Sequence, residues 1–232
     1  MSQAEYSERN RQKMKSGYKI VYAGGEAQII EKKSRFIATV APVENEEEAL
    51  AFIESLRKKY WDATHNCYAY VVGERNEIQR CSDDGEPSGT AGRPMMDVLA
   101  GAGVHNAAVV VTRYFGGTLL GTGGLIRAYS LAVQEGLAAA EVITRIPGVK
   151  LKLTAEYTEL GKIQYLLGEK GLTAQDAIYT EKVELTVLVP EADAVGIRES
   201  LTEETNGRIR IEELGKCGIA NRNGKLMELE KG

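Results

Sequence analysis

The chain has 232 residues, of which 43% are hydrophobic and 27% are charged. This is the balance of an ordinary globular protein and excludes a disordered one, and the length suits two domains. Its 29 basic and 33 acidic residues give a net charge of −4, and neither the part before Pro147 nor the part after it is basic. The charge excludes a generally basic nucleic-acid-binding module, so RNA would have to be bound by a local patch.

The cysteines and histidines narrow the class of protein further. The three cysteines form no C-x-x-C motif and the two histidines are too few for a three-histidine metal site, so we expect neither a disulfide framework nor a metal. There is no run of about 18 apolar residues, and residues 1–17 are polar. We therefore expect a cytoplasmic protein with a flexible N-terminus, no cofactor and no membrane span.

The first predicted domain spans residues 18–146 and mixes strands with helices. A helix with one apolar face is predicted at 44–60, where acidic residues in the first turn and basic residues in the last complement the helix dipole. The apolar run AAVVVT at 107–112 is typical of a strand buried on both faces. The other expected elements are strands at 18–23, 26–32, 35–40 and 67–72, a polar stretch at 73–92, and helices at 94–102 and 125–140.

The second predicted domain, residues 149–214, follows a linker expected at Pro147-Gly148. Its predicted elements are strand 149–156, helix 159–170, strands 173–179 and 182–189, helix 192–202 and strand 208–213. This βαββαβ order is typical of a ferredoxin-like fold, in which helices cover one face of an antiparallel sheet. Residues 215–232 are expected to form a loosely held polar tail.

An acidic loop contains the first candidate site. Asp83, Asp84 and Glu86 lie within four residues, and such carboxylates can bind Mg²⁺ or act as a general acid or base. The following Ser88-Gly89-Thr90 segment leads into a predicted helix, whose first N–H groups can bind an anion. The alternative is an acidic turn whose side chains satisfy their own backbone and cap the next helix.

A glycine-rich loop between two arginines is the second candidate site. The buried strand continues through Arg113-Tyr114 to Gly116-Gly117 and Gly121, and a helix that carries Arg127 follows. Glycines let the backbone approach an anion, and arginines supply bidentate donors. The loop is neither a Walker A motif nor a dinucleotide-binding fingerprint. The alternative is a tight packing loop in which only glycine fits.

Two smaller clusters complete the candidate residues. His65 and Cys67 would share one face of a strand, and His65 is the better functional candidate because Cys67 is expected to be a small buried hydrophobe. The run Lys32-Lys33-Ser34-Arg35 is either a solvated strand end or the local basic patch that the global charge lacks. Lys33 and Arg35 are its candidate anion ligands.

Four motifs resemble, in order and spacing, those of the IMPACT/YigZ family. They are Lys33-Ser34-Arg35-Phe36, Thr64-His65-Asn66-Cys67, the run from Asp83 to Gly92, and the run from Val111 to Gly117 with Leu120-Gly121. The resemblance covers residues 18–140. It implies an N-terminal α/β sandwich of the ribosomal protein S5 second-domain type, similar to domain IV of elongation factor G. It also implies a ferredoxin-like C-terminal domain, similar to domains III and V of that factor.

The resemblance also implies a role in translation, because the eukaryotic members are regulators that counter an amino-acid-starvation kinase response by occupying its activator. Those members carry a different accessory domain, so their protein partners are not carried over. We hypothesise a non-enzymatic regulator that binds RNA or the ribosome, with the basic cluster, the glycine-rich loop and its two arginines contacting phosphates and Tyr114 stacking on bases. The alternatives are a hydrolase or phosphotransferase that uses the acidic cluster with His65, and a protein-interaction module.

Overall fold

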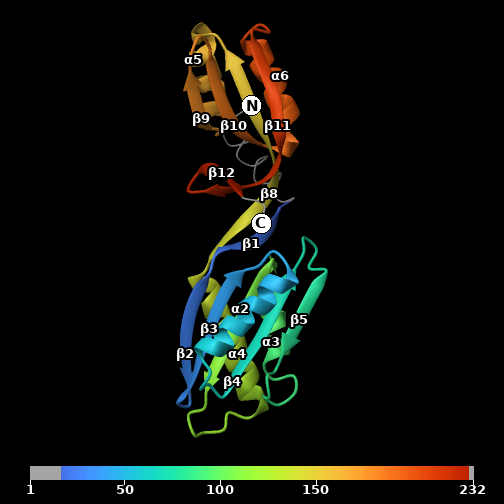
Figure 1. Ribbon diagram of the computed structural model, residues 1–232, viewed down its shortest axis with the longest axis vertical. Helices are drawn as coiled ribbons and strands as arrows, with labels where there is room; N and C mark the ends of the chain where they lie inside the picture. The colour runs from blue at the N-terminus through green and yellow to red at the C-terminus, as the bar shows by residue number, and fades with distance from the viewer. Residues whose placement is uncertain (1–16, 230–232) are drawn as a thin grey trace. The chain divides into compact units, whose positions relative to one another are not determined.

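The computed structural model describes residues 17–229, which divide into two compact units. The first unit comprises residues 18–143, and the second comprises residues 144–229 together with Gly17. Both units combine helices with β-sheet (Figure 1), which confirms the predicted α+β fold class. No helix among the described residues is long and apolar enough to cross a membrane.

Five antiparallel strands form the main sheet of the first unit in the order β2-β3-β7-β4-β5. Their bounds are Gly25–Glu31 for β2, Ser34–Pro42 for β3, His65–Val72 for β4, Ile78–Ser82 for β5 and Ala107–Tyr114 for β7. β1 (Tyr18–Ala23) pairs in parallel with the short β6 (Val104–His105). β7 is the central strand and all its residues except Tyr114 are buried, which confirms the predicted burial on both faces.

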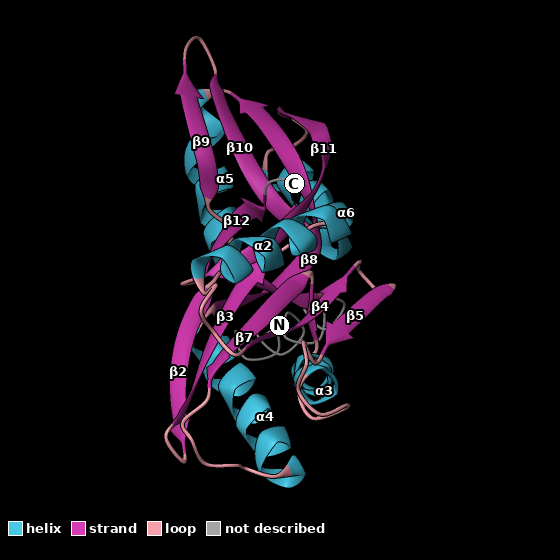
Figure 2. Ribbon diagram, turned by 60° about the horizontal axis from the view of Figure 1, so that its bottom comes forward, coloured by secondary structure: helices cyan, strands magenta, loops and turns pink. Residues whose placement is uncertain are grey.

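Helices cover both faces of this sheet because alternate residues of each strand point to opposite sides. α2 (Glu46–Lys59) packs on the face that carries Ala108 and Val110. α3 (Gly92–Ala102) and α4 (Thr122–Ala139) pack on the face that carries Val109 and Val111 (Figure 2). The two sides of β7 therefore belong to two separate hydrophobic clusters.

Four connecting segments lie at one end of the sheet, which we call the loop end. The antiparallel order brings the end of β2, the start of β3, the end of β7, the start of β4 and the end of β5 to the same edge. The loop end therefore consists of the β2–β3 turn at residues 32–33 and of segments 60–64, 83–91 and 115–121. Every candidate residue of the sequence analysis lies in these segments or directly beside them.

The second unit is a ferredoxin-like domain, as predicted. Its elements are β8 (Glu141–Ala155), α5 (Tyr157–Glu169), β9 (Ala174–Tyr179), β10 (Val183–Pro190), the 3₁₀ turn η2 (Glu191–Asp193), α6 (Ala194–Glu204) and β11 (Ile209–Arg222). The strands pair antiparallel in the order β9-β10-β8-β11. The apolar residues of these strands pack with those of α5 and α6 in one cluster.

The prediction of a linker at Pro147-Gly148 is wrong, because both residues lie inside β8 and pair with β11. Gly148 is also the first residue of β8, in chain order, to pair with β10. Pro147 therefore lies just beyond that ladder, where its missing N–H removes no bond to β10. A Cβ on Gly148 would lie 2.6 Å from the Ile219 side chain. The dipeptide is thus a close-packing feature of a continuous strand.

Two further expectations on polar segments are corrected. The segment at 73–92 contains an edge strand, β5, and the tail expected from residue 215 contains the rest of β11 and the strand β12 (Lys225–Leu229). Asn223 and Gly224 join β11 to β12 with φ of 54° and 83°, which is the turn chemistry that Asn-Gly favours. The hairpin buries Ile219 and Leu229.

Candidate functional site

The acidic loop begins with a tight turn. Asp84 and Gly85 both have positive φ, at 44° and 87°, and the Glu86 N–H donates to the Asp83 carbonyl at 2.9 Å. Aspartate and glycine tolerate this left-handed backbone better than other residues do. The turn separates the three carboxylates, so that each meets different partners.

Asp83 occupies the place that an external anion would take before α3. Its carboxylate accepts hydrogen bonds at 2.8–3.0 Å from three backbone N–H groups, those of Gly89, Ala91 and Gly92. The Thr90 N–H also has a partner within the loop. The expectation that Ser88-Gly89-Thr90 presents N–H groups to an anion is therefore corrected, because the N–H groups of Gly89 and Thr90 are already bonded.

The ionised form of Asp83 is expected to stabilise the loop. Burial opposes ionisation, but the three N–H groups outweigh it and hold the pKa of the Asp83 carboxyl below its ordinary value. The contribution is present above the unfolded aspartate pKa of about 4 and is lost as the pH falls through the lower folded pKa. Asp83→Asn should lower the free energy of unfolding by about 2 kcal/mol at neutral pH, with the difference closing in acid. Urea unfolding across pH measures this, and an equal loss at both ends would contradict it.

A buried ion pair joins the acidic loop to β7. Glu86 is 8% exposed and Arg113 is 5% exposed, and Arg113 Nη1 lies 2.5 Å from Glu86 Oε1. The Tyr129 hydroxyl of α4 donates to the same carboxylate oxygen at 2.8 Å. The Arg113 guanidinium lies over the Phe36 ring, 5.3 Å from its centroid. Arg113 therefore neutralises Glu86 inside the domain and is not presented to a ligand at the surface.

His65 and Asp84 contact each other beside this pair. His65 Nδ1 lies 2.7 Å from the Asp84 carbonyl, and because a carbonyl only accepts, Nδ1 carries the hydrogen. His65 Nε2 faces Glu86 Oε2 at 3.9 Å. The Asp84 carboxylate accepts from the Asn66 N–H at 2.6 Å and from Arg57 at 3.1 Å. The carboxylates of Asp83, Asp84 and Glu86 therefore do not converge on one position. Residues 17–229 contain no group of three His, Cys, Asp or Glu side chains placed to hold a metal.

Cys67 is a buried residue of the core, as predicted. Its side chain has no exposed surface, and its thiol donates to the Asp83 carbonyl at 3.0 Å and lies 3.3 Å from the Tyr129 hydroxyl. Burial raises the pKa of the Cys67 thiol. The thiolate that a nucleophile requires is therefore disfavoured.

The glycine-rich loop is packed at its start and open in its middle. A Cβ on Gly116 would lie 2.1 Å from the Lys33 carbonyl carbon, and the Gly116 N–H donates to the buried Ser34 hydroxyl at 3.1 Å. Gly117 and Gly121 have φ of 83° and 72°, and a Cβ on either would meet nothing within 4 Å. The packing interpretation therefore holds at Gly116, while the middle of the loop faces solvent.

Four exposed cations at the loop end make no ion pair with any described residue. They are Lys32, Lys33, Arg35 and Arg127. Arg127 Nη1 would lie 3.5 Å from a Cβ on Gly123, so its guanidinium sits beside the first turn of α4. That turn has no acidic residue and no side-chain cap, which leaves its N–H groups open to an anion.

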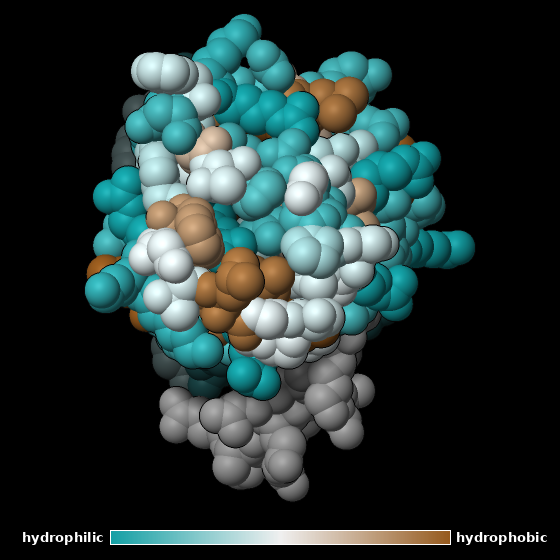
Figure 3. Space-filling model, turned by 90° about the horizontal axis from the view of Figure 1, so that it is seen from below, coloured by the Kyte–Doolittle hydropathy of each residue, from teal (hydrophilic) through white to brown (hydrophobic). Residues whose placement is uncertain are grey.

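Hydrophobic side chains are also exposed at this end. Leu119 is 82% exposed, Phe115 is 48% exposed and Ile126 is 38% exposed. Figure 3 views the molecule from below and shows hydrophobic side chains gathered among polar and weakly polar ones. The surface of the loop end thus combines unpaired positive charge with apolar groups.

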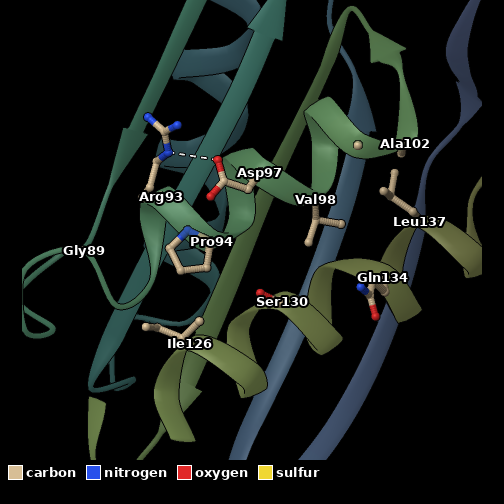
Figure 4. A pocket seen from close by; sticks show the side chains of 11 residues that line it. Gly89, Arg93, Pro94, Asp97, Val98, Ala102, Ile126, Ser130, Gln134 and Leu137 are labelled. Carbon is tan, nitrogen blue, oxygen red and sulfur yellow. Dashed lines mark hydrogen bonds and ion pairs between the residues drawn. The ribbon is translucent and has the colours of Figure 1, made fainter. Parts of the chain in front are cut away.

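A groove of about 720 Å³ runs between α3 and α4 (Figure 4). Its walls are mostly apolar, and its one ion pair, between Arg93 and Asp97 at 2.9 Å, lies at the rim. Of the candidate residues of the sequence analysis, Gly89 alone lines it. The groove is therefore separate from the four unpaired cations and from the buried ion pair.

Known proteins share both the sequence and the arrangement of this chain. Residues 32–137 match the Impact N-terminal domain, and residues 153–208 match a domain of unknown function, DUF1949. The IMPACT family member YvyE of Bacillus subtilis is 44% identical over 218 residues, which cover 94% of this chain and 96% of that protein. The chain belongs to the IMPACT family.

Two further matches support this assignment. The IMPACT family member YigZ of Escherichia coli is 40% identical over 182 residues, which cover 78% of this chain and 89% of YigZ. A crystal structure of a protein described as hypothetical is 36% identical, covers 86% of this chain and 98% of its own, and superposes with a TM-score of 0.55. The family suggested by the sequence motifs is thereby confirmed.

In this IMPACT-family protein the structure separates the predicted site residues into two groups. Asp83, Glu86 and Arg113 face inward and hold the loops together, with Asp84 and His65 beside them. The outward-facing group comprises Lys33, Arg35, Gly117, Gly121 and Arg127, with the half-buried Tyr114 beside them.

The sequence analysis missed two residues of this end. Tyr129 joins the buried pair and is 43 residues from Glu86 along the chain, and Trp61 is 83% exposed. The sequence did offer a signal for Trp61, because the single tryptophan of the chain stands in a polar segment shortly before a strand.

Proposed function

We propose that this IMPACT-family protein binds RNA phosphates at its loop end and acts as a non-enzymatic regulator of translation. The observation that carries the proposal is the set of four unpaired cations at the loop end, one of which, Arg127, lies beside the uncapped start of α4. Two exposed carboxylates, Glu31 and Asp62, lie nearby, and Asp62 is engaged by the Tyr114 hydroxyl. Asp83, Asp84 and Glu86 are held by partners inside the domain, so at this end the four exposed cations outnumber the two fully exposed carboxylates. In a chain of net charge −4, such exposed cations are the local feature that RNA binding requires.

The translational part of the proposal comes from the family. The motifs at the loop end resemble those of eukaryotic IMPACT proteins that regulate translation, and the domain pair resembles parts of elongation factor G. Site geometry rather than fold must carry the function. The geometry favours binding over catalysis because Asp83, Asp84 and Glu86 are each held by partners inside the domain. Arg113 is left out of the phosphate ligands because it is buried against Glu86.

Charge removal tests this function. The triple variant Lys32→Gln, Lys33→Gln and Arg127→Gln should bind single-stranded RNA or ribosomal subunits at least about tenfold more weakly at low salt, since each lost phosphate contact weakens binding. The control variant Lys58→Gln, Arg75→Gln and Lys225→Gln removes the same charge from exposed positions outside the loop end. Equal affinity of the two variants would contradict the proposal.

A protein partner is the second candidate function, and the exposed Leu119 and Phe115 favour it. Leu119→Ser should then abolish binding to ribosomal subunits or another partner protein and leave binding to naked RNA unchanged. Loss of neither interaction would remove this candidate, because Leu119 is the most exposed large hydrophobic side chain of the glycine-rich loop.

A further inference from the structure

One corner of the main sheet is left uncovered on the face that carries α2. The register places Ile30 of β2, Arg35 of β3 and Tyr114 of β7 opposite one another in a row across three strands. These residues share the face of Val110, on which α2 packs, because each strand alternates. α2 packs mainly over β4 and β7, and Ile30 at the edge of the row is 67% exposed. The row is therefore only partly covered at the loop end, because Ile30 and Arg35 are exposed and Tyr114 is half-buried.

Flat groups lie along this surface. The Arg35 guanidinium carbon is 4.4 Å from the centroid of the Tyr114 ring, and Arg35 itself is exposed. The Tyr114 hydroxyl donates to Asp62 Oδ1 at 2.9 Å, which ties the 60–64 segment to the row. Trp61 immediately precedes Asp62 and is 83% exposed. The hydrogen bond thus ties the segment that carries Trp61 to the row, one residue along the chain from the contact with Tyr114.

We infer that Trp61, together with Arg35 stacked on Tyr114, forms a platform for the unpaired bases of single-stranded RNA. This inference rests on the proposed function and adds contacts to the bases of the RNA, which the phosphate contacts do not recognise. Bases stack on aromatic rings and on guanidinium planes, whereas the bases of a duplex are already stacked on each other. An exposed tryptophan is also typical of a protein interface.

Charge complementarity decides between RNA and protein as the occupant. Lys32 and Lys33 form the turn that connects Ile30 to Arg35, and neither has an ion-pair partner among the described residues. Two unpaired lysines therefore lie on the hairpin that carries Arg35, so cations for phosphates adjoin the stacked Arg35 and Tyr114, as a strand of bases and phosphates requires. A protein partner would need to bury these lysines, which interfaces tend to avoid.

The chain provides its own reporter for this platform, because Trp61 is the single tryptophan of the sequence. We would titrate the full chain with an oligouridylate of about ten nucleotides and follow tryptophan fluorescence. Stacking on uracil should quench the emission, whereas a blunt-ended RNA duplex, which has no unpaired bases, should bind without quenching it. Trp61→Ala should weaken binding to the oligouridylate about tenfold or more, and Trp61→Phe should retain most of the affinity. The control Leu50→Ala, which removes another exposed hydrophobic side chain of the unit, should bind as the wild type does.

The outcomes separate this inference from the function on which it rests. RNA binding that is lost in the triple cation variant, without quenching and without an effect of Trp61→Ala, would overturn the platform and leave the proposed function standing. Absence of RNA binding by the wild type at low salt would overturn both. A Trp61→Ala variant that binds the oligouridylate normally but loses a ribosomal protein would assign the surface to protein and overturn the inference.

Discussion

Replacing Glu86 by alanine is expected to lower the free energy of unfolding by about 3–5 kcal/mol. The change leaves the Arg113 guanidinium buried without its carboxylate and deprives the Tyr129 hydroxyl of its acceptor. Arg113 Nε already has no hydrogen-bond partner in the structure, so the remaining charge has little to compensate for its burial. Urea denaturation followed by circular dichroism measures the loss.

A double variant distinguishes the effect of an unpaired buried charge from the effect of lost packing. Glu86→Leu combined with Arg113→Met removes both charges and should recover most of the lost stability, because paired burial of charge is no more favourable than well-packed apolar groups. Glu31→Ala is the control, since Glu31 is an exposed carboxylate at the same end that makes no ion pair with any residue of 17–229. If Glu86→Ala lowers the free energy of unfolding by less than about 1 kcal/mol, the pair contributes no more than a surface ion pair does. That result would contradict a buried Glu86–Arg113 pair.

Gly116→Ala should cost about 3 kcal/mol of unfolding free energy and also weaken RNA binding. The new Cβ would lie 2.1–2.3 Å from backbone atoms of Lys33 and Ser34, and backbone cannot give way as a flexible side chain does. The β2–β3 turn would have to move away from the loop, and its two lysines would move with it. Stability and RNA affinity are both measured on the same preparation.

Gly117→Ala is the matched control for this effect. Gly117 has a φ of 83° but open space around its Cβ position, so alanine there should cost only the strain of a left-handed backbone, about 1–2 kcal/mol. RNA affinity should be unchanged by this variant. Equal effects of the two substitutions would show that backbone strain, and not the contact with Lys33, governs the loop.

Hydrophobic periodicity predicted the elements in which buried residues recur regularly. It failed where an element depends on contacts with residues that are distant in the sequence. The apolar run of β7 and the amphipathic faces of the helices are local signals, and they were confirmed. β5 was missed because it is a short edge strand with little buried surface. Pro147-Gly148 was misinterpreted because its role depends on Ile219, which lies far along the chain. The Asn223-Gly224 turn was a recognisable signal, but the polar residues around it concealed the hairpin.

The candidate site shows the same division between local and distant information. The loops and their residue types were identified from the sequence, but the partner of each charge was not. Glu86 and Arg113 are 27 residues apart, and Tyr129 comes from a third element, so their mutual burial depends on the tertiary fold. Asp83 differs, because its acceptor role is local and was one of the two interpretations of the acidic loop. Trp61 carried no motif, and its meaning depends on the exposed row beside it.

The salt dependence of RNA binding tests the central claim most directly. The logarithm of the binding constant for single-stranded RNA should fall linearly with the logarithm of the salt concentration, by about 0.7 for each phosphate contacted. The double variant Lys32→Gln and Lys33→Gln should therefore have a slope shallower than the wild type by about 1.4, whereas Arg75→Gln should keep the wild-type slope. Parallel lines for the wild type and the double variant would contradict the claim that the loop end contacts RNA phosphates.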